Sequence, residues 1–198
     1  MNARYDCFCK LTDLLGAQES LTEARRHLHQ FPELSFQEKS TAQWVGDKLQ
    51  AWGYQVTRNV GGHGLVATLK NGEGKGIDLR ADMDALPIQE ETQKPYASQH
   101  AGTMHACGHD GHTAMLLGAA QQLAKTKNFK GTVHLVFQPA EEAGKNSGAQ
   151  QMIADGLFER FPCDAIFGIH NHPGADVGTF MFGAGAFMSA SDTCYIKV

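Results

Sequence analysis

The stretch Met104–His112, MHACGHDGH, contains one thiol, three imidazoles and a carboxylate within nine residues. Thiolate and imidazole groups are ligands that zinc and similar divalent ions prefer. Cys107 and His109 are two positions apart, and residues at this spacing do not share a face of a helix. A shared ion therefore requires loop or extended backbone here, which Gly108 permits. We predict a metal-binding loop, followed by a helix at residues 113–124.

Segments with helix and strand patterns alternate along the chain on both sides of this loop. We expect further helices at residues 20–29, 38–52 and 148–155. Short β-branched or apolar runs predict strands at residues 54–57, 65–69, 77–79, 132–137 and 165–169. Strands that alternate with helices indicate an α/β fold with a largely parallel sheet.

Reactive side chains follow three of the predicted strands. Asp82 and Asp84 come after the strand at 77–79. The pair Glu141–Glu142 follows the strand at 132–137, and His170 and His172 follow the strand at 165–169. In open α/β sheets, ligands bind at the carboxyl ends of strands, where several loops converge. The sequence therefore predicts a site at this edge of the sheet.

The acidic groups also have structural interpretations. Glu141 and Glu142 could form a solvated helix start, where carboxylates complement the helix dipole. Asp82 and Asp84 could cap the loop before Pro87. Both alternatives stay open from the residues alone.

The histidines near the predicted site divide into ligands and neighbours of ligands. His105 and His112 are interpreted as residues behind the ligands or as helix-start residues, because four donors from one loop would crowd a single ion. Of His170 and His172, one is interpreted as a ligand and the other as its hydrogen-bonding partner. Cys107 could be a buried apolar thiol, but such thiols rarely lie among three histidines.

The first predicted helix has a start signal and a polar face. Ser20 and Glu23 form a capping-box pattern. His27 and His29 lie beside the pair Arg25–Arg26, and we interpret them as part of a solvated face.

Composition bounds the class of protein. The 198 residues are 42% hydrophobic and 19% charged, which suits one globular domain or one domain and the start of another. The net charge of −4 does not indicate a basic surface for binding nucleic acid or an anionic membrane. The five cysteines are odd in number and scattered, with Cys7 and Cys9 interpreted as incidental, so a reducing cytoplasm is expected. No apolar run approaches membrane length.

Five segments together resemble the successive signatures of an enzyme family. The chain is similar to the amidohydrolases that include hippurate hydrolase, N-acyl-amino-acid amidohydrolases and plant auxin-conjugate hydrolases, within the di-metal group of aminoacylases and carboxypeptidases. The resemblance covers nearly the whole chain and implies a three-layer α/β catalytic domain like that of di-zinc exopeptidases, with a mostly parallel mixed sheet flanked by helices. The segments are Arg25–Phe36, Asp82–Pro87, Met104–His112, Gln138–Glu142 and Phe167–His170.

This resemblance implies roles for individual residues. By it, Cys107, His109, Glu142 and His170 are metal ligands, and Glu141 is the general acid/base. The implied reaction is hydrolysis of the amide bond of N-acyl amino acids such as hippurate, by a water that two divalent ions activate. A thiolate with imidazoles favours zinc, and manganese, cobalt and nickel are alternatives.

The Asp-Met-Asp segment departs from the wider group, where a histidine ligand usually stands in place of Asp82. We expect Asp84 to orient a ligand and leave Asp82 unassigned.

The chain is shorter than the proteins it resembles, in which a lid and dimerisation domain interrupts the catalytic domain. We expect residues 1–186 to form the N-terminal part of the catalytic domain and residues 187–198 the first strand of the lid. The complete protein is expected to be a homo-oligomer through that lid. Two alternatives stay open: a truncated metal-binding fragment without turnover, and a structural zinc module.

Overall fold

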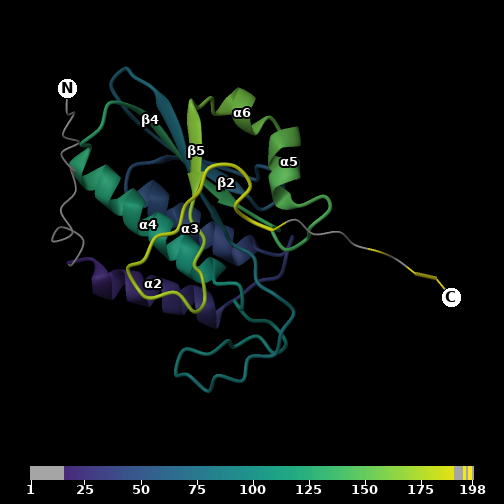
Figure 1. Ribbon diagram of the computed structural model, residues 1–198. Helices are drawn as coiled ribbons and strands as arrows, with labels where there is room; N and C mark the ends of the chain where they lie inside the picture. Colours follow the sequence, from purple (N-terminus) through teal and green to yellow (C-terminus); the bar gives the residue numbers. More distant parts are fainter. Residues whose placement is uncertain (1–15, 190–193, 195, 198) are drawn as a thin grey trace.

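The computed structural model describes residues 16–189, 194, 196 and 197 (Figure 1). Cys7 and Cys9 lie outside these residues. So does half of the predicted lid strand at 187–198, which therefore stays a prediction. The helices are α2 (Gln18–Gln30), α3 (Lys39–Ala51), α4 (His109–Thr126), α5 (Gly148–Ala154) and α6 (Leu157–Arg160). The strands are β1 (Gln55–Arg58), β2 (Leu65–Asn71), β3 (Gly76–Asp82), β4 (Gly131–Gln138) and β5 (Ala165–Gly168).

The five strands form one mixed sheet in the order β1-β2-β4-β3-β5. The β1–β2 and β2–β4 pairs are antiparallel, whereas β3 pairs in parallel with both β4 and β5. The predicted α/β fold with a mixed sheet between helices is confirmed, and its parallel part consists of β4, β3 and β5. These three strands consequently end at the same edge of the sheet.

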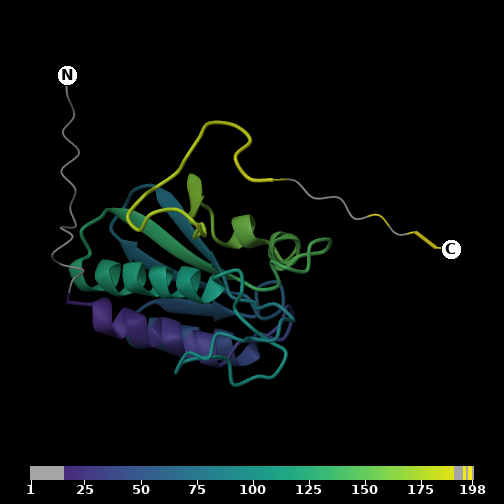
Figure 2. The same ribbon diagram turned by 60° about the horizontal axis from the view of Figure 1, so that its bottom comes forward.

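Both faces of the sheet are covered, which makes the fold three-layered (Figure 2). Alternate residues of a strand point to opposite faces. Along β2, Leu65 and Ala67 pack into the core shared with α3 and α4, whereas Val66 packs with Met152 of α5 and Leu157 of α6. A fully buried side chain of this size contributes about 1.5–3 kcal/mol, so the two cores hold the sheet in place.

Helix α2 lies side by side with α4 (Figure 2). The interpretation of its polar face as solvated is wrong for His29, which is 4% exposed. His27 is partly buried and stacks on Trp44 with ring centroids 4.6 Å apart. The reason is helix packing, because the face of α2 that carries Leu28 and His29 is the buried one.

The predicted capping box at the start of α2 is also wrong. The helix begins at Gln18 with Ala17 as N-cap and has no side-chain cap. Ser20 lies inside the first turn, and its hydroxyl donates to the Ala17 carbonyl oxygen at 2.9 Å.

Helix α4 begins earlier than the sequence pattern predicts, at His109 instead of Thr113. Gly108 precedes it with a left-handed backbone, φ 89°. A Cβ atom at Gly108 would overlap the side chain of Asn171, which follows β5. The glycine therefore allows the loop before α4 to approach the end of β5. No helix among the described residues is long and apolar enough to cross a membrane.

Candidate metal centre

The ends of three parallel strands and the start of α4 bring predicted site residues together. Asp82 ends β3, Glu141 follows β4, and His170 follows β5. His109 is the first residue of α4. The expected convergence of loops at this edge of the sheet is therefore present.

His109 lies at the centre of the cluster and is fully buried. Its Nδ1 is 2.8 Å from the backbone oxygen of Asp84 and 3.2 Å from that residue's Oδ1. These contacts fix the ring so that Nε2 faces three carboxylates. It lies 3.6 Å from Asp82 Oδ2, 3.8 Å from Glu141 Oε2 and 3.8 Å from Glu142 Oε1.

Cys107 and His170 form the opposite side of the cluster. The Cys107 Sγ is 3.5 Å from the His170 Nε2, and both lie near His109. Burial raises the pKa of the Cys107 thiol to about 12, and the Glu142 carboxylate adds to this effect. A thiol in this environment loses its proton readily only when a cation balances the charge.

The residues present fit a divalent cation. His109 Nε2 and Glu142 Oε1 are buried, and neither has a hydrogen-bond partner in the described part of the chain. Unpartnered buried polar atoms cost free energy, and a metal ion would satisfy both. Among the described residues, three groups have ligand atoms within 4.8 Å of one another: Cys107, His109 and His170; His109, Glu141 and Glu142; Asp82, His109 and His112.

Asp82 has a side-chain partner at each of its two oxygens. Its Oδ1 is 2.6 Å from His112 Nδ1, and its Oδ2 is 2.8 Å from Arg80 Nη1. Burial works against ionisation, but these two partners and the nearby His109 hold the pKa of Asp82 well below its usual range. His112 also accepts a hydrogen bond from the Asn171 amide at 3.0 Å.

Asp84 connects the end of β3 to the turn after β4. Its Oδ2 accepts hydrogen bonds from Ser35 Oγ at 2.7 Å and from the Glu142 amide at 2.9 Å. Burial opposes its charge, but the contact with His109 and these two donors lower its pKa. Asp84 thus orients both His109 and the Glu142 backbone.

His105 and His172, two histidines expected near the ligands, differ in their burial. His105 is buried, and neither ring nitrogen has a hydrogen-bond partner among the described residues. Burial lowers the pKa of His105 to about 4, so the ring is neutral. His172 is exposed and belongs to none of the three groups of candidate ligands among the described residues.

Sequence reasoning missed two buried groups that support the cluster. Glu38 is fully buried and accepts a hydrogen bond from the Ala140 amide at 2.7 Å. His29 Nδ1 is 2.7 Å from Asp110 Oδ2 on α4, and Arg25 Nε is 2.8 Å from the same oxygen. The helical spacing of Arg25 and His29 with Leu28 was a signal for the second group. Glu38 has no such signal, because a glutamate before a helix is also an ordinary exposed residue.

Comparison with known proteins agrees with this geometry. Residues 79–195 match the peptidase family M20/M25/M40. Hippurate hydrolase of Campylobacter jejuni subsp. jejuni is 48% identical over 189 residues, which cover 95% of this chain and 49% of that protein. N-acyl-L-amino acid amidohydrolase of Geobacillus stearothermophilus is 40% identical over 176 residues, 88% of this chain and 47% of that protein.

A solved structure is similar as well. The YXEP protein of Bacillus subtilis, a dinuclear metal-binding peptidase of the M20 family, superposes with a TM-score of 0.77 at 42% identity. The match covers 83% of this chain and 46% of that protein. The chain thus spans about half the length of the curated relatives it matches. On the sequence match and the shared fold, the chain belongs to peptidase family M20/M25/M40.

Proposed function

We propose that this protein hydrolyses the amide bond of small N-acyl amino acids such as hippurate, with two divalent metal ions. The observation that carries the proposal is the buried His109 Nε2, which faces the carboxylates of Asp82, Glu141 and Glu142 and lies beside a thiol and a second imidazole. Relatives named hippurate hydrolase and N-acyl-L-amino acid amidohydrolase support the substrate class.

The ligands in this proposal are Cys107, His109, Glu142 and His170. Their mixed sulfur, nitrogen and oxygen donors suit zinc first, with manganese, cobalt or nickel as alternatives. When bound, the ions polarise the amide carbonyl and lower the pKa of water. The dinuclear metal binding of the similar peptidase supports two ions.

Glu141 is the proposed general acid/base. Its side chain is 42% exposed at the edge of the cluster, where it can reach a substrate. Burial and the negative charge of Asp82 raise its pKa, which makes it a better proton acceptor than an ordinary glutamate. Glu141 takes a proton from the water that attacks the acyl carbon. It then returns this proton to the amine as the carbon–nitrogen bond breaks, which leaves a carboxylic acid and a free amino acid.

The second candidate is a metal-binding chain without turnover, and the grouping of candidate ligands around His109 is equally consistent with it. A homo-oligomer through a lid domain and a cytoplasmic location stay predictions from the sequence.

Hydrolysis of hippurate by the purified chain, supplied in turn with zinc, manganese, cobalt or nickel, tests the proposal. Glu141→Gln is expected to lower turnover about 10²–10⁴-fold, because it removes the proton acceptor but no ligand. The exposed Glu91 gives the matched control, and Glu91→Gln is expected to leave turnover unchanged. Full turnover by the Glu141→Gln variant would contradict the proposal, and metal binding without wild-type turnover would support the second candidate.

A further inference from the structure

We infer that Glu38 is a positioning residue for the Glu141–Glu142 turn, which it holds through the backbone amide of Ala140. The inference rests on the proposed function for the chemistry of Glu141. The contact that carries it joins residues far apart in the sequence: Glu38 Oε1 accepts a hydrogen bond from the Ala140 amide at 2.7 Å. The same oxygen accepts one from the Phe36 amide at 3.0 Å.

The backbone at Ala140 needs such a restraint. Its φ is 48°, in the left-handed region that costs a residue with a Cβ atom about 1–2 kcal/mol. A conformation of this kind persists only where the surroundings hold it. The Ala140 carbonyl oxygen accepts a hydrogen bond from the Gly148 amide at 3.0 Å, and a Cβ at Gly148 would overlap the Pro139 carbonyl oxygen. Both polar backbone groups of Ala140 are therefore held from outside the turn.

Two buried carboxylates hold the backbone on either side of Glu141. Glu38 accepts from the amide of Ala140, directly before Glu141, and Asp84 accepts from the amide of Glu142, directly after it. Glu38 and Asp84 are 0% and 1% exposed. The proposed base thus projects from a short segment whose two flanking amides are fixed. A small shift of this segment would move the base and the ligand Glu142 together.

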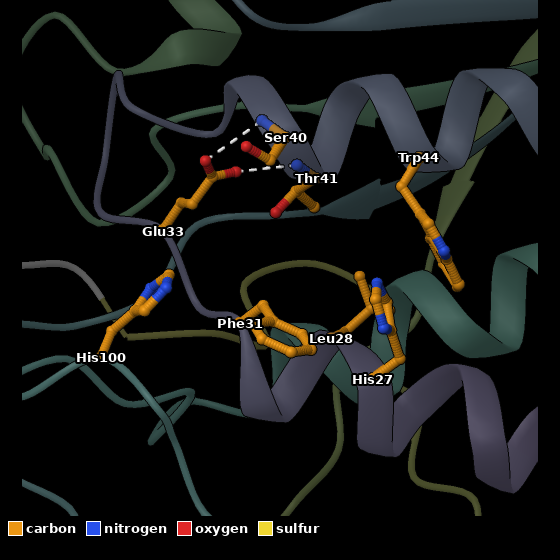
Figure 3. Close-up of a pocket in the computed structure, with 8 residues that line it drawn as sticks. All are labelled: His27, Leu28, Phe31, Glu33, Ser40, Thr41, Trp44 and His100. Atoms are coloured by element: carbon orange, nitrogen blue, oxygen red, sulfur yellow. Dashed lines mark hydrogen bonds between the residues drawn. The ribbon is translucent and has the colours of Figure 1, made fainter.

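Glu38 is itself held at the start of α3. The carboxylate of Glu33 accepts hydrogen bonds from the Ser40 amide at 3.1 Å and the Thr41 amide at 2.7 Å (Figure 3). These are first-turn amides that lack partners within the helix. Glu33 also lines a cavity of about 330 Å³ between α2 and α3. Glu33 therefore fixes the first turn of α3, which directly follows Glu38.

For holding the Ala140 amide, the length of the Glu38 side chain is more important than its charge. The second oxygen of Glu38, Oε2, is buried and has no hydrogen-bond partner in the described part of the chain. Burial raises the pKa of Glu38, which favours the neutral carboxyl group. A glutamine places a carbonyl oxygen at the same distance and can replace it. An aspartate keeps the acid group but is one methylene shorter, so from the same backbone position it cannot reach the Ala140 amide.

The test compares Glu38→Gln and Glu38→Asp in the chain loaded with cobalt. Cobalt affinity and the visible absorption of the bound ion report on Glu142, the ligand that shares the turn. We expect Glu38→Asp to weaken cobalt binding about 10–100-fold and to change the spectrum, as losses of residues behind a ligand do. Glu38→Gln is expected to leave both unchanged, and so is the exposed control Glu91→Gln.

Unchanged affinity and spectrum in Glu38→Asp would overturn the inference. So would weakened binding in Glu38→Gln with normal binding in Glu38→Asp, because that order shows a role of the charge. If Glu38→Asp does not fold, or if the wild-type chain binds no cobalt, hydrogen exchange of the wild-type Ala140 amide decides. Slow exchange, similar to that of the β4 amides, supports the inference, and fast exchange overturns it. Cobalt binding without hippurate hydrolysis would count against the proposed function alone.

Discussion

Asp78 and Asp82 are four residues apart on β3, point to the same face of the strand and are both buried, yet their pKa values shift in opposite directions. Burial raises the pKa of Asp78, whose oxygens have no hydrogen-bond partner among the described residues beyond a contact with the Cys163 thiol. At Asp82 burial has the same tendency, but His112 and Arg80 prevail and lower the pKa. The difference lies in the partners and not in the depth of burial.

Position along the strand explains the difference in partners. Asp82 is the last residue of β3, where the loops after β4 and β5 and the start of α4 converge. Asp78 is in the middle of the strand, opposite His134 of β4. That histidine is bonded to Thr68 Oγ1 at 2.8 Å, and burial lowers its pKa, so it is neutral. Asp82 at the strand end therefore has an imidazole and a guanidinium as partners, whereas Asp78 in mid-strand faces a neutral histidine and mainly costs stability.

The largest effect on stability is expected from Asp82→Asn. The change removes the negative charge between Arg80 and His112, and breaking a buried pair in this way costs about 3–5 kcal/mol. Urea unfolding of the metal-free chain at neutral pH measures it. Because the folded pKa of Asp82 is lowered, its contribution is present above the ordinary value of 3.8 and is lost as the pH falls through the folded pKa. If the free energy of unfolding falls by less than about 1 kcal/mol, Arg80 and His112 do not stabilise Asp82 in this way.

A third buried carboxylate, Asp110, extends the comparison, because its partner His29 is an imidazole whose pKa the contact raises. His29→Gln is expected to cost about 2 kcal/mol through loss of a hydrogen bond to a charged group. The Asp110 contact raises the pKa of His29, so its contribution is full below the ordinary value of 6.5 and is lost as the pH rises through the folded pKa. The deficit of the variant should therefore shrink between about pH 6 and about pH 9 in urea unfolding. A deficit that grows with pH would contradict this assignment.

The smallest change in the free energy of unfolding is expected from Asp78→Asn, and this change is an increase. A raised folded pKa means that the contribution of Asp78 is full below the ordinary value of 3.8 and is lost as the pH rises through the folded pKa. At neutral pH the asparagine variant should be about 1 kcal/mol more stable than the wild-type chain, because no buried charge is formed. Thermal unfolding at about pH 4 and about pH 7 checks it, since the gain should disappear at the lower pH. Destabilisation at neutral pH would show that Asp78 has an ionic partner.

Local pattern in the sequence was enough to predict part of the fold and of the site. Acids and histidines that directly follow predicted strands located Asp82, Glu141 and His170 at one edge of the sheet. The direction of β1 and β2 could not be predicted. Their residues carry no local signal that β1 pairs antiparallel with β2, or β2 with β4. The start of α4 was placed four residues late, because the pattern of apolar residues begins only after the polar first turn.

Support from distant segments was not predictable. The hydrogen bonds of Glu38 to Ala140 and of His29 to Asp110 join residues 102 and 81 positions apart. Each depends on how one helix packs against another element, and local propensity carries no information on that packing.

Anomalous diffraction at the zinc edge would show whether the strand ends around His109 bind divalent ions. Crystals of the chain grown with zinc should show a peak about 2.0–2.1 Å from His109 Nε2, within bonding distance of Cys107, Glu142 or His170. Strong zinc binding in solution with the anomalous peaks elsewhere on the molecule, and none at His109, would show that these strand ends are not the metal site.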